Sequence, residues 1–91
     1  MFDRTDQRKA LTDVPPETLA ALRPGERGVV QTLHCTGLTR RRLLDLGLVP
    51  GTEVEAVMVS PNGDPIAYQV RGTLLALRRE DAASIEIRRV S

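Results

Sequence analysis

Two side chains that could bind a soft metal ion, His34 and Cys35, lie next to each other in this chain of 91 residues. They stand at the end of a segment rich in β-branched residues, and successive residues on a β-strand point to opposite faces of the sheet. One ion therefore cannot readily reach both side chains, and the sequence contains no second histidine or cysteine to complete a site. We predict no metal site and no cofactor.

Catalytic groups are also missing from the sequence. The single histidine could act as a base only for Cys35 beside it or for a serine or threonine, and no segment resembles the glycine-flanked nucleophile turn of a hydrolase. The carboxylates of Asp3, Asp6 and Asp13 lie in a polar N-terminal stretch, and the others are scattered singly over strands and turns. No glycine-rich loop precedes a helix, as phosphate binding would require. We predict that the protein is not an enzyme.

Three consecutive arginines, Arg40, Arg41 and Arg42, form the one cluster of charge in the sequence. Guanidinium groups recognise carboxylates and phosphates, so one interpretation is a patch that binds a partner. The other interpretation is a solvated helix face. In either case we expect an ion pair between Arg41 and Asp45, one helical turn apart, to offset part of the unfavourable placement of these charges.

The element that must position these arginines is one short helix, predicted over Thr39–Leu46. Thr39 is suited to cap its N-terminus, Leu38 is placed to pack on Leu43, and Gly47 is suited to end it. A helix of about two turns is marginal alone in water, so its leucines are expected to pack on a sheet. The residues predicted to have this structural role are Leu43, Leu44, Leu46, Gly47 and Leu48.

Alternating and β-branched segments predict five strands around this helix. The strands fall at residues 28–34, 52–59, 66–70, 73–78 and 85–90. A tight turn at Pro50-Gly51 leads from the helix into the second strand, and turns at Asn62-Gly63, where Gly63 is structural, and at Arg71-Gly72 join the strands that follow. A sheet of this size must curl to bury one face and protect its edges. The sequence therefore predicts an all-β domain, a small five-stranded barrel with one short inserted helix.

The strand after the Pro50-Gly51 corner alternates between two faces from Thr52 onward. Its outward face begins with Glu53 and Glu55 and continues with two valines where charge would be expected, which indicates a covered edge or a contact surface. Core packing under the short helix explains the valines equally well. The residues predicted to face inward are Val54, Ala56 and Met58, and the outward valines are Val57 and Val59.

Composition excludes several classes of partner. The net charge is only +1, and Phe2 and Tyr68 are the only aromatic residues. Nucleic-acid-binding barrels need a basic stripe with stacking rings, and proline-recognition modules need an aromatic groove. The sequence shows no membrane span, no secretory signal and no cysteine pair. We predict a cytoplasmic protein that binds no nucleic acid and does not insert into a membrane, with a mobile leader at residues 1–17 and one domain at 18–91.

Three separated blocks of the sequence resemble one family. "LRPGERGVV", "RRLLDLGLVPGTEVEAV" and "GDPIAYQVRGTLLALRREDAASIEI" follow one another in the order and spacing of the FeoA domain, a small component of bacterial ferrous-iron uptake, over about Thr18–Val90. The resemblance implies an SH3-like barrel that acts as an accessory protein to the membrane transporter FeoB, through the transporter's GTP-binding cytoplasmic region. A similar fold ends the iron-dependent repressors, so a metalloregulator-type or nucleic-acid-associated barrel is the alternative. Self-association also stays open.

We predict a partner-binding surface that joins the helix to the strand after it. The arginines at the start of the helix oppose its dipole, and the two valines extend apolar surface along the adjacent strand. Contact with an acidic, partly apolar partner would resolve both features. Arg42 is left out because its stem is expected to pack on the barrel. The predicted surface consists of Arg40, Arg41, Pro50, Gly51, Glu53, Glu55, Val57 and Val59.

Overall fold

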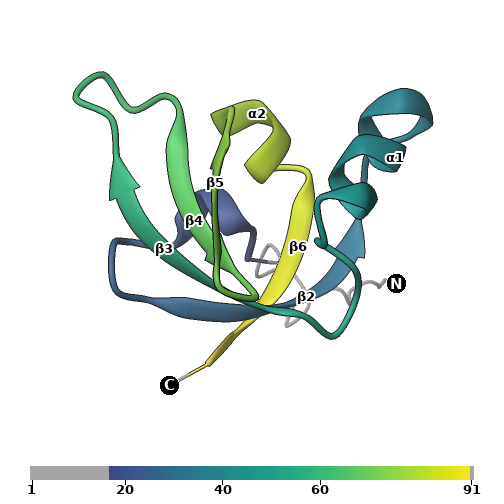
Figure 1. The fold of residues 1–91 in the computed structure, drawn as a ribbon, viewed down its shortest axis with the longest axis horizontal. Helices are drawn as coiled ribbons and strands as arrows, with labels where there is room; N and C mark the ends of the chain where they lie inside the picture. The colour runs from purple at the N-terminus through teal and green to yellow at the C-terminus, as the bar shows by residue number, and fades with distance from the viewer. Residues whose placement is uncertain (1–16, 91) are drawn as a thin grey trace, which may run out of the picture.

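Five strands form one antiparallel sheet in the computed structural model, which describes residues 17–90 (Figure 1). Along the sheet they lie in the order β5-β4-β3-β2-β6. The prediction of an all-β domain with five strands is confirmed, and the leader predicted for residues 1–17 lies outside the described residues except for Glu17. The strands are β2 (Arg27–Leu33), β3 (Glu53–Val59), β4 (Ile66–Val70), β5 (Thr73–Leu77) and β6 (Ile85–Val90).

Three short helical elements accompany the described strands: one precedes β2, and the other two connect β2 to β3 and β5 to β6. They are the 3-10 turn η2 (Leu19–Ala21), the nine-residue helix α1 (Gly37–Asp45) and the single turn α2 (Arg79–Ala82). Figure 1 shows α1 to one side of the sheet, beyond the end of β2. Within residues 17–90 no helix has the length and apolar character needed to cross a membrane.

The helix α1 begins two residues earlier than the sequence pattern predicts. Thr36, in an extended conformation, is the N-cap residue, and Gly37 enters the helix with a φ of +64°. The predicted cap at Thr39 is therefore wrong, because glycine accepts a backbone conformation that strains other residues and so allows an earlier start. The predicted packing of Leu38 on Leu43 is also wrong. Leu38 falls in the first turn on its outer side and is 85% exposed.

The C-terminus of α1 lies where the sequence predicts it, at Gly47, whose φ is +101°. The amide of Gly47 donates to the carbonyl of Leu44 at 3.0 Å, and the amide of Leu48 donates to that of Leu43 at 3.1 Å, which is the Schellman motif. Leu43 and Leu48 are fully buried and Leu44 packs against the core, as predicted. Leu46 is 41% exposed, so its predicted packing role is wrong. It is the C-cap residue, where the reversing chain leaves the side chain at the surface.

A β-bulge in β3 reverses the faces of its last two residues. The pairing of β3 with β4 is regular up to Ala56 and shifts register before Met58, so Val57 is the extra residue. Met58 is consequently 60% exposed, whereas Val59 packs against the core. The sequence predicts the opposite faces for these two residues, because strict alternation leaves no room for a bulge. Val54 and Ala56, before the bulge, are buried as predicted.

Two hairpin connections join β3, β4 and β5, and the first is a loop over residues 60–65. Gly63 supplies a positive φ in this loop, +88°, as the sequence predicts. The second turns on Arg71 and Gly72, with φ values of +52° and +80°, which is the pattern of a type I′ turn. Val70 and Thr73 flank this turn as paired residues. Two-residue hairpins fix the register of the strands that they join, so β5 is held firmly against β4.

The terminal strands of the described sheet, β5 and β6, do not pair with each other, and contacts through the core join the two ends instead. Tyr68 of β4 is fully buried, and its hydroxyl group donates a hydrogen bond to the carbonyl of Leu19 in η2 at 2.9 Å. The segment before η2 is tied to β6, because the amide of Ile87 donates to the carbonyl of Glu17 at 2.8 Å. These bonds link β4 to β6 across the inside of the curled sheet.

Substitution of the one fully buried leucine of α1 tests how the helix is held. We expect Leu43→Ala to lower the free energy of unfolding by about 2–4 kcal/mol, because it leaves a cavity in the core. Leu46→Ala removes a side chain of the same type from an exposed position and should cost no more than about 0.5–1 kcal/mol. Urea denaturation of both variants gives the comparison, and equal losses would contradict this packing.

The buried ring of Tyr68 should titrate abnormally. Burial raises the pKa of Tyr68 to about 12, from 10.0. Between these values the unfolded chain loses the phenol proton while the native protein keeps it, so stability present below pH 10 is lost as the pH rises toward 12. Because the chain contains one tyrosine, tyrosinate absorbance in the near ultraviolet reports this residue alone. A native midpoint near 10 would show that the ring is not buried, and Tyr68→Phe should abolish the signal.

Candidate functional site

The outward face of α1 carries the two arginines of the predicted surface. Arg40 and Arg41 line a hollow of about 390 Å³, together with Gly37, Leu44 and Asp45. Among the described residues neither guanidinium forms an ion pair, and the predicted pair between Arg41 and Asp45 is absent. Because α1 begins at Gly37, Arg40 lies at the end of the first turn and Arg41 beyond it. The predicted opposition to the helix dipole at the N-terminus therefore holds for Arg40 and is wrong for Arg41.

The third arginine of the cluster, Arg42, forms an ion pair within the domain. Its Nη2 atom lies 2.7 Å from Oδ2 of Asp81 in α2, and the Asp81 side chain is only 13% exposed. This ion pair holds α1 to the rest of the domain. The omission of Arg42 from the predicted surface agrees with this contact, although an ion pair rather than the packing of its stem occupies the side chain.

Apolar surface adjoins the arginines on α1. Leu38 is the most exposed large apolar side chain among the described residues, at 85%. It precedes Arg41 by three positions, and side chains three apart on a helix are neighbours on its surface. The outer side of α1 therefore offers positive charge and an apolar side chain together. Such a surface suits a partner that presents carboxylates next to an apolar residue.

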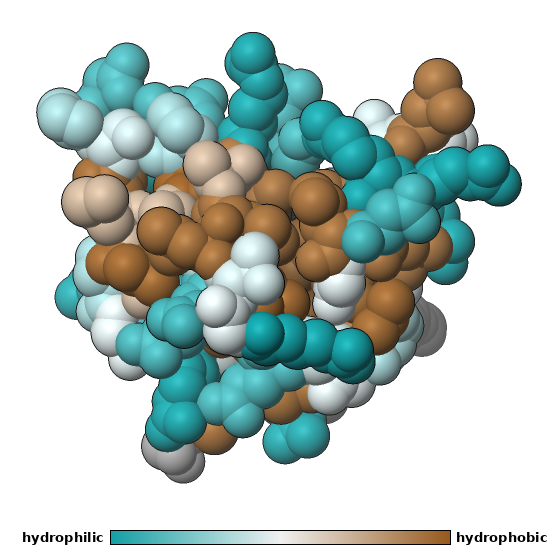
Figure 2. Space-filling view, in the orientation of Figure 1, coloured by the Kyte–Doolittle hydropathy of each residue, from teal (hydrophilic) through white to brown (hydrophobic). Residues whose placement is uncertain are grey.

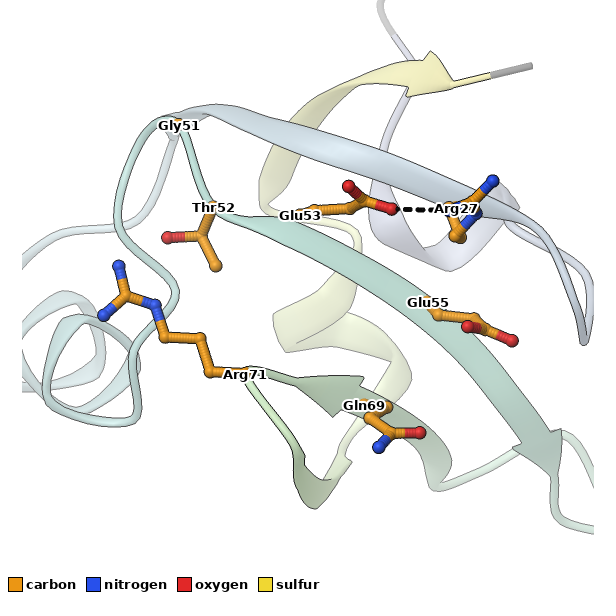
Figure 3. A pocket seen from close by; sticks show the side chains of 7 residues that line it. All are labelled: Arg27, Gly51, Thr52, Glu53, Glu55, Gln69 and Arg71. Carbon is orange, nitrogen blue, oxygen red and sulfur yellow. Dashed lines mark hydrogen bonds and ion pairs between the residues drawn. The ribbon is translucent and has the colours of Figure 1, made fainter.

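A second hollow, of about 420 Å³, lies on the outer face of the sheet (Figure 3). Within it Arg27 of β2 and Glu53 of β3 form an ion pair, with Nη1 to Oε2 at 2.9 Å. Both side chains are about half exposed, so solvent screens this pair and its contribution to stability is small. The residues that line the hollow are Arg27, Gly51, Thr52, Glu53, Glu55, Gln69 and Arg71.

Arg71 and Thr52 lie at one end of this sheet hollow. Figure 3 shows the Arg71 side chain extending toward Thr52 and Gly51, away from Glu55. Thr52 is 6% exposed, and its hydroxyl oxygen is buried without a hydrogen-bond partner among the described residues. Since this oxygen has no contact with solvent, a ligand in the hollow could not reach it without movement of the residues above it.

The residues of the predicted partner surface are divided between these two places. Arg40 and Arg41 line the α1 hollow, whereas Gly51, Glu53 and Glu55 line the sheet hollow. Figure 1 shows the far end of β3, which carries the two valines, on the opposite side of the domain from α1. Pro50 is exposed at the corner between them, Val57 is 38% exposed, and Val59 packs inward.

The side chains of His34 and Cys35 lie in different surroundings and do not form a joint site. His34 is exposed, with its Nε2 atom 2.7 Å from Oε1 of Glu86, whereas Cys35 packs against the core. No group of three or more His, Cys, Asp or Glu side chains within residues 17–90 is arranged to hold a metal ion.

Sequence reasoning missed several residues of these surfaces. Arg71 was placed in a turn, but only the type I′ geometry of that turn brings its side chain beside Thr52. The alternation of β4 offered a usable signal for Gln69, which lies on the outward face between two buried residues. The partner of Arg42, by contrast, comes from α2, 39 positions later in the chain, and no local pattern indicates it.

Comparison with known proteins identifies the family. The family model of the FeoA domain matches residues 17–89. An Fe(2+) transport protein A/Fe(2+) transporter FeoB fusion protein of Porphyromonas gingivalis is 36% identical over 73 residues, which cover 80% of this chain. The chain spans only 9% of the length of that fusion protein.

Two solved structures share the fold. The solution structure of the FeoA protein from Chlorobium tepidum is 36% identical with a TM-score of 0.78, and the match covers 82% of this chain and 71% of that one. The crystal structure of Stenotrophomonas maltophilia FeoA complexed with zinc, described as an SH3 domain protein, is 35% identical with a TM-score of 0.69. That match covers 78% of this chain and 88% of the other. The chain therefore has an SH3-like fold and belongs to the FeoA family of ferrous iron transport proteins.

Proposed function

We propose that this protein is a cytoplasmic accessory protein of ferrous iron uptake that binds the cytoplasmic region of a FeoB-type transporter. The fusion of the two proteins in one chain of Porphyromonas gingivalis supports the pairing. A covalent link keeps two domains at high effective concentration, which is useful only when they act on each other. The role is one of binding, and we assign no catalytic step to the domain.

The proposed site is based on a difference among the three arginines of the cluster. Arg42 is engaged with Asp81, whereas Arg40 and Arg41 are exposed and unpaired among the described residues. Within the described residues, therefore, no ion pair of Arg40 or Arg41 stabilises the domain. Together with the exposed side chain of Leu38 they form a surface suited to an acidic and partly apolar partner. We define Leu38, Arg40 and Arg41 as the α1 surface.

The outward residues of β3 have less support as part of the predicted partner surface. Glu53 is already neutralised by Arg27, and Val59 is turned toward the core. Glu55 and Gly51 also line the sheet hollow, and Pro50 lies next to Gly51 in the chain. We propose them as a secondary contact that a large partner reaches only after it has docked on α1.

Charge reversal on α1 tests the proposed function. Arg40→Glu/Arg41→Glu should weaken binding of the purified cytoplasmic region of the transporter by about tenfold or more, because repulsion replaces attraction at the contact. The thermal midpoint should change little, since neither side chain has a described ion-pair partner. Binding is measured by calorimetry at low salt, where screening is weakest.

The matched control reverses two exposed arginines elsewhere, Arg23→Glu/Arg88→Glu, and changes the net charge by the same amount. We expect this control to bind within about threefold of the parent, which separates a local contact from long-range attraction. Equal affinity of the α1 variant and the control would place the contact outside α1. Absence of binding by the parent itself would overturn the choice of partner.

A further inference from the structure

Two neighbouring features of the sheet hollow each reduce the stability of the domain. The first is the backbone of Arg71, which has a φ of +52°, the one positive φ at a residue other than glycine within residues 17–90. A residue with a Cβ atom is strained in this left-handed conformation, and type I′ turns favour asparagine, aspartate or glycine there. Arginine therefore weakens the turn that joins β4 to β5.

The second feature is the hydroxyl group of Thr52. The residue is 6% exposed, and its hydroxyl oxygen has no hydrogen-bond partner among the described residues. A buried hydroxyl group without a partner costs free energy that a valine of the same shape would not cost. The backbone of Thr52 is satisfied, because its amide donates to the carbonyl of Val49 at 3.1 Å and its carbonyl accepts from the amide of Val30 at 2.9 Å. Only the side chain lacks a hydrogen bond.

Arg71 and Thr52 line the same hollow, although they come from different turns of the chain. Figure 3 shows the Arg71 side chain extending from the end of β4 toward Thr52 and Gly51. This side chain is exposed and forms no ion pair with another described residue. A strained residue and a buried polar group without a partner therefore lie together, which is a pattern typical of binding sites.

Polar side chains alone line this hollow. Figure 2 shows apolar side chains gathered on the face of the molecule where β5 lies in Figure 1. In the sheet hollow, by contrast, every side chain is charged or able to form hydrogen bonds. A ligand bound there is therefore held by charge and hydrogen bonds rather than by burial of apolar surface.

The charges in the hollow indicate which anion fits it. Arg27 and Glu53 form an ion pair with each other, which leaves the positive charge of Arg71 at one end and the negative charge of Glu55 toward the other (Figure 3). One guanidinium group matches the single charge and the planar shape of a carboxylate. A phosphate group would bring additional negative charge close to the two glutamates, without a second unpaired cation among the lining residues.

We infer that the sheet hollow binds a carboxylate group, with the guanidinium group of Arg71 and the hydroxyl group of Thr52 as hydrogen-bond donors. Because the hydroxyl oxygen is covered in the free protein, the exposed side chain of Arg71 changes its position as the ligand enters. The carboxylate belongs to a small organic acid or to the C-terminus of a peptide. This site does not depend on the α1 surface or on the proposed transporter.

Four probes test the site and distinguish the two sources of the carboxylate. Acetate and acetyl-Gly-Gly with a free C-terminus are titrated into the isotope-labelled full chain at constant ionic strength, and the backbone amides are followed by nuclear magnetic resonance. We expect saturable shifts at Thr52 and Arg71. Acetamide and the amidated peptide lack the charge and should bind at least about tenfold more weakly. Binding of the peptide at least about threefold tighter than acetate supports a peptide ligand, and equal affinity supports a small acid.

Two substitutions separate binding from stability. Thr52→Val keeps the shape of the side chain without its hydroxyl group, and Arg71→Asn gives the turn the Asn-Gly pair that type I′ geometry favours. We expect each variant to raise the thermal midpoint by about 2 °C or more, because each removes a destabilising feature. Each should nevertheless weaken binding of acetate and of the peptide by about tenfold or more.

The matched control, Arg23→Asn, removes the same charge from an exposed arginine that does not line the hollow. It should bind both carboxylate probes within about threefold of the parent.

Several results would overturn the inference. These are equal binding of acetamide and acetate, shifts confined to the α1 surface, no binding of either carboxylate at millimolar concentration, and unchanged binding by Arg71→Asn. Tighter binding of inorganic phosphate than of acetate would contradict the choice of anion. Charge reversal on α1 leaves the sheet hollow unchanged, so the test of the proposed function and this test fail independently.

Discussion

The hydrogen bond from the Tyr68 hydroxyl to the carbonyl of Leu19 ties β4 to η2 inside this domain, and the bond between Ile87 and Glu17 ties the segment before η2 to β6. Strands β5 and β6 do not complete a ring of backbone pairing, so closure depends on the side chains that fill the interior. Tyr68 is the only aromatic ring among the described residues and is fully buried, with aliphatic side chains around it. The side chains of the core, rather than pairing of β5 with β6, therefore close the barrel.

The way in which α1 is attached to the domain explains why it can serve as a contact element. The Schellman motif at Gly47 returns the chain sharply to the sheet and buries Leu43 and Leu48. Those two leucines and the Arg42–Asp81 pair fix the helix from its inner side. Its outer side is then free of structural constraint. An element held on one side and exposed on the other presents its residues rigidly, which reduces the ordering cost of binding.

Much of this fold could be predicted from the sequence, because its signals are local. The strand alternation, the Gly63 and Arg71-Gly72 turns and the glycine that ends α1 each depend on a few adjacent residues. The bulge at Val57 could not be predicted, since it satisfies the pairing of β3 with β4 rather than any preference of β3 itself. The start of α1 differs from the prediction because Thr39 has the residue type of an N-cap, whereas Thr36 holds that position. The candidate site was predicted only in part, because the Arg42–Asp81 contact and the separation of α1 from the end of β3 both depend on tertiary structure.

If the α1 surface meets the partner, binding protects that helix while the closed core stays unchanged. Amide hydrogen exchange of the full chain is therefore measured with and without the cytoplasmic region of the transporter. We expect exchange to slow in residues 37–45 on binding, while the amides of β2, β3 and β4 keep the protection that they have in the free protein. Unchanged exchange across α1, with new protection confined to the sheet hollow around Glu55 and Gln69, would contradict this expectation.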